Sequence, residues 1–217
     1  MDNKISLFLM TYKGFRVLEY LIPYFKETVD LVVASKDSKL QNDYFEEIKN
    51  TCLAKQIPFK NRNEVNTINA TYVMAISWRW IIDKSEAKPI VLHDSLLPKY
   101  RGFNPLCLIN GGVQIGVTAL FATEEYDRGD IIAQSRSTEQ ILHNYIDLVH
   151  KVCTQISNKI LLVFLKTRIL LPYSLWRDEE DYQIDWNKNC QEIRRMVDAV
   201  RFPYVGAQAN IHNKTIS

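Results

Sequence analysis

The sequence has 217 residues, 47% of them hydrophobic and 24% charged, with a formal net charge of +2. This size suits one α/β domain with a full core and a short appendage. The near-neutral charge excludes the strong electrostatic surface typical of nucleic-acid and membrane-surface binding, so we expect neither kind of partner.

The chain up to residue 164 alternates apolar, strand-like runs with amphipathic segments. The predicted strands cover residues 5–10, 31–35, 57–59, 71–76, 88–92 and 116–122. The predicted helices cover residues 15–25, 43–55 and 145–164, with a turn at residues 11–14 before the first helix. This order predicts an α/β, Rossmann-like, mostly parallel open sheet with helices on both faces. Gly14 is interpreted as a turn glycine, because no phosphate-binding glycine motif surrounds it.

No segment indicates secretion, membrane insertion or metal binding. The apolar run at residues 5–10 is too short for a secretory signal. The run at residues 160–171 is interrupted by charges and is shorter than the ~20 residues that span a bilayer. The four cysteines are scattered without metal-ligand spacing and are interpreted as reduced, mostly buried thiols. We expect a cytoplasmic protein without a metal ion.

The most informative block follows the predicted strand at residues 88–92 and reads H-D-S-L-L-P-K-Y-R-G over residues 93–102. In open α/β sheets, ligand sites form at the carboxyl ends of the strands, which is where His93 is expected. Histidine, with an ordinary pKa of ~6.5, suits proton transfer near neutral pH, so His93 is a candidate general base. A lone histidine at a strand end is more often structural, and the flanking block is what favours catalysis.

A second block, D-R-G-D-I-I over residues 127–132, follows the apolar run at residues 116–122 and an acidic stretch. If both strands end at the same edge of the sheet, Asp127 and His93 converge. An aspartate beside the histidine would orient the ring and favour the imidazolium. The alternative is that this block is simply a turn, for which Asp130 is the better candidate of the two aspartates.

Together, the two blocks resemble the formyltransferase family that uses N10-formyltetrahydrofolate as its one-carbon donor. The family motif is close to N-x-H-x-S-L-L-P-x-x-x-G, followed by D-x-G-D/P-I, and this chain has V-L-H-D-S-L-L-P-K-Y-R-G and D-R-G-D-I-I. The resemblance implies formyl transfer from this folate to an amine, without a metal ion. It implies that His93 is the general base and oxyanion partner, that Asp127 orients the ring and that the protein is a homodimer.

One departure from the family motif concerns the residue two positions before the histidine. The family has an asparagine there, whose amide helps to polarise the formyl carbonyl, whereas this chain has Val91. A valine side chain cannot donate a hydrogen bond. Loss of one preorganised oxyanion donor typically lowers the rate by on the order of 10²–10³. A slow enzyme, a different donor and a lost reaction are all compatible with Val91.

The resemblance also assigns candidate folate contacts. Ser77 and Trp78, directly after the predicted strand at residues 71–76, correspond to a segment that lies against the folate in the family. Gly129 and Asp130 belong to the second motif and are candidates for the same cofactor. For Trp78, packing in the core is an equally good interpretation.

The C-terminal part of the chain changes character at about residue 176. An acidic, aromatic stretch at residues 177–186 precedes a predicted helix with one apolar face, and P-Y-x-G-A follows at residues 203–207. This order resembles the branch of formyltransferases that modifies nucleotide-linked amino sugars. We therefore expect a catalytic domain at residues 1–175 and a C-terminal extension at residues 176–217.

The sugar branch implies a set of substrate contacts that combine charged groups for phosphate with aromatic faces for a base or hexose. The candidates are Asp94, Lys99, Arg101, Trp186, Arg201, Phe202 and Tyr204. A solvated surface position is an equally good interpretation of the first three. A hydrophobic cap over the sheet is the alternative for the last four.

The expected function is formyl transfer from N10-formyltetrahydrofolate to a dTDP-linked 3- or 4-amino-4,6-dideoxyhexose, as in lipopolysaccharide or glycan biosynthesis. The sequence leaves the hexose, the amino position and the base open. A methionyl-tRNA formyltransferase fits less well, because the sequence ends before that enzyme's additional C-terminal domain and lacks a basic surface signal. A glycinamide ribonucleotide formyltransferase would need a glycine- and serine-rich phosphate loop after the first strand. The non-enzyme alternative binds folate or a nucleotide-sugar without turnover, and Val91 is its main support.

Overall fold

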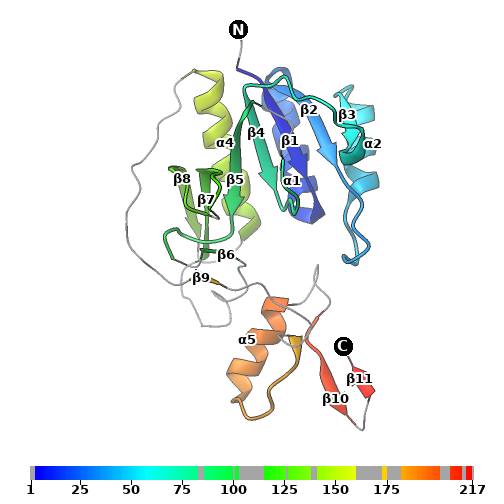
Figure 1. The fold of residues 1–217 in the computed structure, drawn as a ribbon, viewed down its shortest axis with the longest axis vertical. Helices are drawn as coiled ribbons and strands as arrows, with labels where there is room; N and C mark the ends of the chain where they lie inside the picture. Colours follow the sequence, from blue (N-terminus) through cyan, green and yellow to red (C-terminus); the bar gives the residue numbers. More distant parts are fainter. Residues whose placement is uncertain are drawn as a thin grey trace.

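The chain is built around a seven-stranded sheet with strand order β3-β2-β1-β4-β5-β7-β8 (Figure 1). The computed structural model describes residues 3–82, 86–99, 101–102, 115–125, 127–137, 141–159, 173–174, 182–200, 206–211 and 214–216. The strands of the sheet are β1 (Ile5–Leu9), β2 (Val29–Ala34), β3 (Phe59–Asn61), β4 (Tyr72–Ile76), β5 (Lys88–His93), β7 (Ile115–Phe121) and β8 (Ile131–Ser137). The first five strands in the spatial order are parallel, whereas β7 is antiparallel to β5 and β8 is antiparallel to β7. The predicted α/β class with a mostly parallel open sheet is confirmed, but the described helices that cover the sheet pack on one face rather than on both.

One face of this sheet carries the larger hydrophobic cluster. Alternate strand residues such as Leu7 and Met74 point to this face, as the two-residue repeat of a β-strand requires. Three helices pack their apolar sides on it, and each large side chain that they bury contributes roughly 1.5–3 kcal/mol. These helices are α1 (Thr11–Phe25), α2 (Phe45–Ala54) and α4 (Ile141–Ser157).

The opposite face carries a smaller cluster that includes Phe8 and is covered by the segments that follow β3 and β4. Ile90 and Leu92 of β5 belong to the larger cluster. Alternation along the strand therefore directs Val91 and His93 to the opposite face, away from α1 and α4. The predicted catalytic histidine thus lies on the side of the sheet with the smaller cluster.

The C-terminal elements lie beyond the carboxyl ends of the parallel strands. Figure 1 shows helix α5 and the β10–β11 hairpin below the sheet, with the short β6–β9 pair between them and the sheet. The bounds are β6 (Arg101–Gly102), β9 (Tyr173–Ser174), α5 (Cys190–Val200), β10 (Ala209–Ile211) and β11 (Lys214–Ile216). Two short 3-10 helices, η1 (Lys26–Thr28) and η2 (Arg62–Glu64), complete the described elements. The division at residue 175 stays a prediction.

The element bounds differ from the predictions at several places, and β3, for example, covers Phe59–Asn61 rather than residues 57–59. The predicted turn at residues 11–14 is instead the first turn of α1, which begins directly after Met10. Helix α4 begins at Ile141 rather than at residue 145, and it ends at Ser157. Strand β8 was not predicted. Among the helices of the described residues, none has both the length and the apolar character needed to cross a membrane.

Candidate active site

The candidate site lies at the carboxyl ends of β1, β4 and β5. Strand β1 has β2 on one side and β4 on the other, so the chain reverses its direction of growth between β1 and β4. Ligands of open α/β sheets bind in the crevice outside the carboxyl ends at such a reversal. His93, the last residue of β5, ends the strand beside β4.

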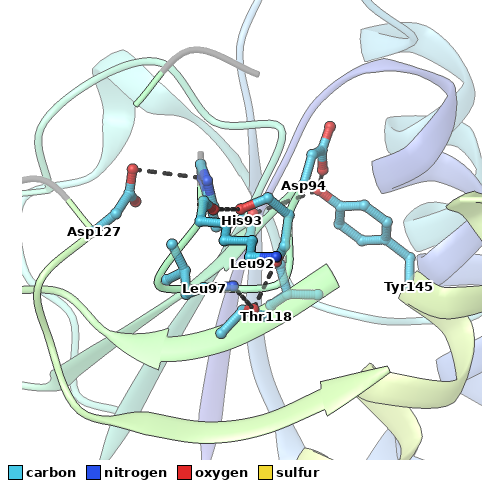
Figure 2. Close-up of polar contacts among 9 residues, drawn as sticks. Leu92, His93, Asp94, Leu97, Thr118, Asp127 and Tyr145 are labelled. Carbon is cyan, nitrogen blue, oxygen red and sulfur yellow. Dashed lines mark hydrogen bonds and ion pairs between the residues drawn. The ribbon is translucent and has the colours of Figure 1, made fainter. Parts of the chain in front are cut away.

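His93 and Asp127 meet at this edge, as the two sequence blocks predict. Their closest atoms, Nδ1 of His93 and Oδ2 of Asp127, are 3.4 Å apart, and the side chains are 8% and 15% exposed (Figure 2). A carboxylate on the Nδ1 side orients the imidazole and leaves Nε2 as the nitrogen directed away from it. The contact is long for a hydrogen bond, and catalytic contacts of this kind commonly tighten once substrate binds.

The route by which Asp127 reaches His93 differs from the one that the sequence suggested. Strand β7 is antiparallel to β5, with Thr118 opposite His93 and Phe121 opposite Ile90. The chain therefore leaves β7 near the amino-terminal half of β5, away from the histidine. Residues 122–130 bring it back to His93, so the convergence does not come from two strands ending at one edge.

The turn that carries Asp127 is held close to the end of β7. Asp127 has a φ of +54°, a backbone conformation that few side chains other than Asp and Asn tolerate. A Cβ on Gly129 would come 1.5 Å from the carbonyl oxygen of Phe121, so only glycine fits there. The Phe121 amide donates to the Asp130 carbonyl at 3.0 Å, while the Asp130 side chain is exposed. The block is thus a turn and also the support of the Asp127 carboxylate.

The S-L-L-P loop after His93 is fixed by side chains of the antiparallel strands. Thr118 donates to the Ser95 carbonyl at 2.6 Å and accepts from the Leu97 amide at 3.1 Å (Figure 2). Gln134 donates to the Leu97 carbonyl at 2.9 Å. The Ser95 hydroxyl donates to the Lys99 carbonyl at 2.7 Å. Sequence reasoning missed Thr118 and Gln134, because a polar residue inside a strand does not show which loop it will bind.

Asp94 is engaged on the other side of His93. Lys13 in the first turn of α1 forms an ion pair with Asp94 at 2.5 Å, and the Tyr145 hydroxyl of α4 donates to the same carboxylate (Figure 2). Burial opposes ionisation of Asp94, but Lys13 and Tyr145 outweigh it and hold the pKa of this carboxyl below its usual value. Neither Lys13 nor this role of Tyr145 was found from the sequence.

Val91 occupies the position where a hydrogen-bond donor was expected by resemblance. It lies in the middle of the sheet, paired with Ala75 of β4 and Leu120 of β7, and it is half-buried. Its side chain shares a face of the sheet with His93 by alternation.

Ser77 and Trp78 follow β4 at the same edge of the sheet. Ser77 has a φ of +54°. The Ser77 hydroxyl and the Trp78 Nε1 are buried and have no hydrogen-bond partner among the described residues. Buried polar atoms without partners are uncommon in proteins. Trp78 also packs edge-on against Phe8 with ring centres 5.0 Å apart, so its packing role is real.

For the remaining predicted substrate contacts, the structure gives the exposure of three side chains. Lys99 is exposed, and Arg101 in β6 is 6% exposed, with its Nε lacking a partner within the described part of the chain. Trp186 is 63% exposed. Three predicted substrate residues lie outside the described residues, namely Arg201, Phe202 and Tyr204.

Two of the thiols that the structure describes are poor candidates for nucleophiles. Cys52 and Cys153 are free and buried, and burial raises the pKa of each to about 12. Cys190 is free and exposed on α5. Within the described ranges, no group of three His, Cys, Asp or Glu side chains could hold a metal ion.

Comparison with known families agrees with this geometry. The profile of the formyl transferase family matches residues 31–155, and that of the formyl transferase C-terminal domain matches residues 177–217. The chain belongs to the formyl transferase family. The family predicted from the His93 and Asp127 blocks is therefore confirmed.

Curated relatives of this formyl transferase include a bifunctional resistance protein and methionyl-tRNA formyltransferases. It is 28% identical to a bifunctional polymyxin resistance protein ArnA of Wigglesworthia glossinidia brevipalpis, covering 98% of this chain and 37% of the relative. It is 27% identical to a methionyl-tRNA formyltransferase of Fusobacterium nucleatum, covering 70% of this chain and 55% of the relative. The chain thus spans well under two thirds of each of these relatives.

Solved structures with the same fold include sugar-modifying and tRNA-modifying proteins. The N-formyltransferase of Helicobacter canadensis, in complex with folinic acid and dTDP-3-aminofucose, superposes with a TM-score of 0.73 at 20% identity. That match covers 99% of this chain and 86% of the other. A 4-N formyltransferase of Francisella tularensis gives 0.73 at 17% identity, covering 99% and 95%. The methionyl-tRNA formyltransferase of Clostridium thermocellum gives 0.72 at 15% identity, covering 99% and 90%. At these identities the likeness shows the fold alone.

Proposed function

We propose that this formyl transferase moves the formyl group of N10-formyltetrahydrofolate to the amine of a dTDP-linked 3- or 4-amino-4,6-dideoxyhexose. The pairing of His93 with Asp127 at the end of β5 is the observation that carries the proposal of formyl transfer. Family membership supports the reaction type. The acceptor is supported by the C-terminal sequence pattern, and proteins of the same fold include an N-formyltransferase in complex with dTDP-3-aminofucose and a sugar 3N-formyl transferase.

The proposed reaction joins the amine nitrogen to the formyl carbon and releases tetrahydrofolate. The amine attacks the formyl carbon, and an oxyanion develops on the formyl oxygen. His93 takes the proton that the ammonium must lose, and Asp127 stabilises the imidazolium that results. The C–N10 bond then breaks, and N10 receives a proton as tetrahydrofolate leaves. Positioned general acid–base catalysis of this kind contributes roughly 10²–10⁴ in rate.

The folate is proposed to bind along the carboxyl ends of β1 and β4. Ser77 and Trp78 supply buried donors there, and the Thr11 hydroxyl after β1 is a third buried donor that lacks a partner in the described residues. The Met10 amide donates to the Ile76 carbonyl at 3.2 Å, which holds these two strand ends together. Gly129 and Asp130 are proposed to contribute through the turn that they form with Asp127.

The nucleotide-sugar is proposed to lie between the S-L-L-P loop and the C-terminal extension, residues 176–217. The exposed Lys99 and the largely buried Arg101 are proposed to neutralise its pyrophosphate. The exposed indole of Trp186 offers a stacking face. Arg201, Phe202 and Tyr204 are proposed as further contacts from the sequence pattern alone. A homodimer in the cytoplasm stays a prediction.

A second candidate acceptor is the amine of methionyl-tRNA. Curated relatives that are methionyl-tRNA formyltransferases match 70% of this chain at 27–28% identity. The near-neutral formal charge of +2 favours the small substrate, since tRNA binding depends on neutralising phosphates.

The test is a chromatographic formylation assay with N10-formyltetrahydrofolate and two kinds of acceptor, a panel of dTDP-amino sugars and methionyl-tRNA. The His93→Ala and Asp127→Asn variants are run beside the wild type. A new N-formyl sugar peak that both variants lower by ~10²-fold or more would support the proposed reaction. If formyl-methionyl-tRNA were the main product, the acceptor would be methionyl-tRNA rather than the proposed dTDP-amino sugar. Folate binding without any product would favour the degenerate fold that Val91 suggests.

A further inference from the structure

We propose that Lys13, Asp94 and Tyr145 act together as positioning residues that hold the catalytic His93 in place, a role that rests on the proposed formyl transfer. These side chains come from α1, the loop after β5 and α4. They are separate from the Asp127 contact, which lies on the other side of the histidine (Figure 2).

Both carboxylate oxygens of Asp94 are engaged. The Lys13 ammonium contacts Oδ2 at 2.5 Å, and the Tyr145 hydroxyl donates to Oδ1. Lys13 Nζ also lies 5.0 Å from the centre of the Tyr145 ring, where a cation–π attraction favours it. Asp94 was predicted as a substrate contact, and the structure pairs its carboxylate with these two side chains.

The Tyr145 hydroxyl contacts the residues on both sides of the histidine in the chain. It lies 3.4 Å from the Leu92 carbonyl, directly before His93, and bonds to Asp94, directly after it. Tyr145 is 1% exposed and belongs to the main hydrophobic cluster, so its hydroxyl is held by the packing of α4. The Tyr145 hydroxyl therefore restrains the backbone on both sides of His93.

The contacts of Lys13 and Tyr145 with Asp94, which we call the tether, lie directly after the last residue of β5 that pairs with a neighbouring strand. His93 is the last residue of β5, and its pairing with Thr118 is the final step of that ladder. Asp94 is the first residue beyond it. A displacement of about 1 Å at a catalytic group can lower the rate by ~10²-fold, so a tether at this point has a direct effect on the reaction.

Stability alone is a weak reason for this arrangement. The Lys13 and Asp94 side chains are only 23% and 22% exposed. Pairing partly buried charges gains little over well-packed apolar residues, because both ions must be desolvated. The ion pair between Lys13 and Asp94 is better explained by a role in fixing the position of His93.

The test compares variants of the cluster with matched variants elsewhere. Lys13→Met, Asp94→Asn, Tyr145→Phe and the double variant Lys13→Met/Asp94→Asn are measured for kcat, both KM values and Tm. Lys151→Met removes an ion pair of 2.7 Å to Asp147, and Tyr20→Phe removes a hydroxyl 3.1 Å from His150, both between residues outside the cluster. These two controls are expected to keep the wild-type kcat.

The expected result is a kcat that is ~10- to 100-fold lower in the cluster variants, with each KM within about threefold of wild type. The double variant should recover Tm relative to Lys13→Met, because no unpaired carboxylate remains, while its kcat stays low. Recovery of kcat together with Tm would overturn the proposal in favour of a purely structural role. A raised KM for the acceptor at unchanged kcat would overturn it in favour of substrate contact.

A measurement without substrate separates this proposal from the proposed function. The protein has four histidines, so the ring signals are few and His93 can be assigned by NMR from a His93→Gln variant. Positioning predicts that the His93 ring signal shifts or broadens in Asp94→Asn and Tyr145→Phe but not in Lys151→Met. If the wild type formylates no acceptor but the His93 ring signal changes in the cluster variants, the proposed function is refuted and the proposed positioning of His93 is supported. An unchanged ring signal in the cluster variants would refute the tether.

Discussion

Thr118 on β7 fixes the loop that contains Leu97, because its side-chain oxygen accepts the Leu97 amide at 3.1 Å and donates to the Ser95 carbonyl at 2.6 Å. Thr118→Val keeps the shape and removes these two hydrogen bonds together with a third, which the Thr118 hydroxyl accepts from Gln134 at 2.9 Å. We expect a loss of roughly 1–3 kcal/mol in unfolding free energy, as for other unpaired buried groups. Formyl transfer should also slow, which chemical denaturation and the formylation assay would detect together. A stable variant with unchanged kcat would contradict this role.

Val91→Asn restores a side-chain amide on the face of β5 that carries His93. If the oxyanion lacks a donor in the wild type, kcat should rise, by up to about 10²–10³-fold for an ideally placed group. The asparagine must fit between Ala75 and Leu120, so Tm is measured alongside, and Val91→Leu serves as the control of similar size without a donor. An unchanged kcat in a well-folded Val91→Asn protein would mean that another group already binds the oxyanion.

Gly129→Ala should disrupt the turn that presents Asp127. The added Cβ would collide with the Phe121 carbonyl oxygen, so the backbone must shift and the contact between Asp127 and His93 should lengthen. The expected outcome is a kcat close to that of Asp127→Asn. Gly206→Ala is a useful comparison, since Gly206 has a φ of +89° but no atom within 4 Å of the added Cβ. It should lower stability slightly and leave kcat unchanged.

Ser77→Ala removes a buried hydroxyl that lacks a partner among the described residues. The ligand-free protein should be no less stable than the wild type, because an unpaired buried hydroxyl contributes an unfavourable ~1–3 kcal/mol. Affinity for the folate should nevertheless fall if Ser77 contacts it. Isothermal titration with a stable formylfolate analogue measures this affinity, and an unchanged dissociation constant would remove Ser77 from the folate site.

The stability of the protein should depend on the ionised Asp94 carboxylate. Its pKa in the folded protein is held below the unfolded value of ~3.9, so its stabilising contribution is complete above that value and is lost as the pH falls through the folded pKa. In thermal melts from pH 7 to pH 3, the Tm difference between wild type and Asp94→Asn should shrink towards acid pH. A constant difference over this range would show that charge is not the cause.

Much of the fold was predictable because the buried parallel strands are short apolar runs between helical segments. β8 was missed because it is an edge strand, with Gln134 and Arg136 exposed between buried residues, and its sequence reads as polar. The two blocks that bring His93 and Asp127 together were found from the sequence. The direction of β7 was not, since the residues of a strand do not show which way it runs. The tether from Lys13 to Asp94 joins distant parts of the chain, and no local pattern indicates it.

Because β7 is antiparallel to β5, the residues that pair in the sheet are different from the residues of the connection that carries Asp127. The ladder between β7 and β8 ends at the pairing of Leu120 with Ile131, and the residues between these strands only need to span back to His93. A one-residue insertion between Ala122 and Asp127 would therefore leave the hydrogen-bonded strands intact while moving the acid out of reach. Evolution could thus retune or silence the chemistry of this protein by changing the length of a single connection, without a substitution at either reacting side chain.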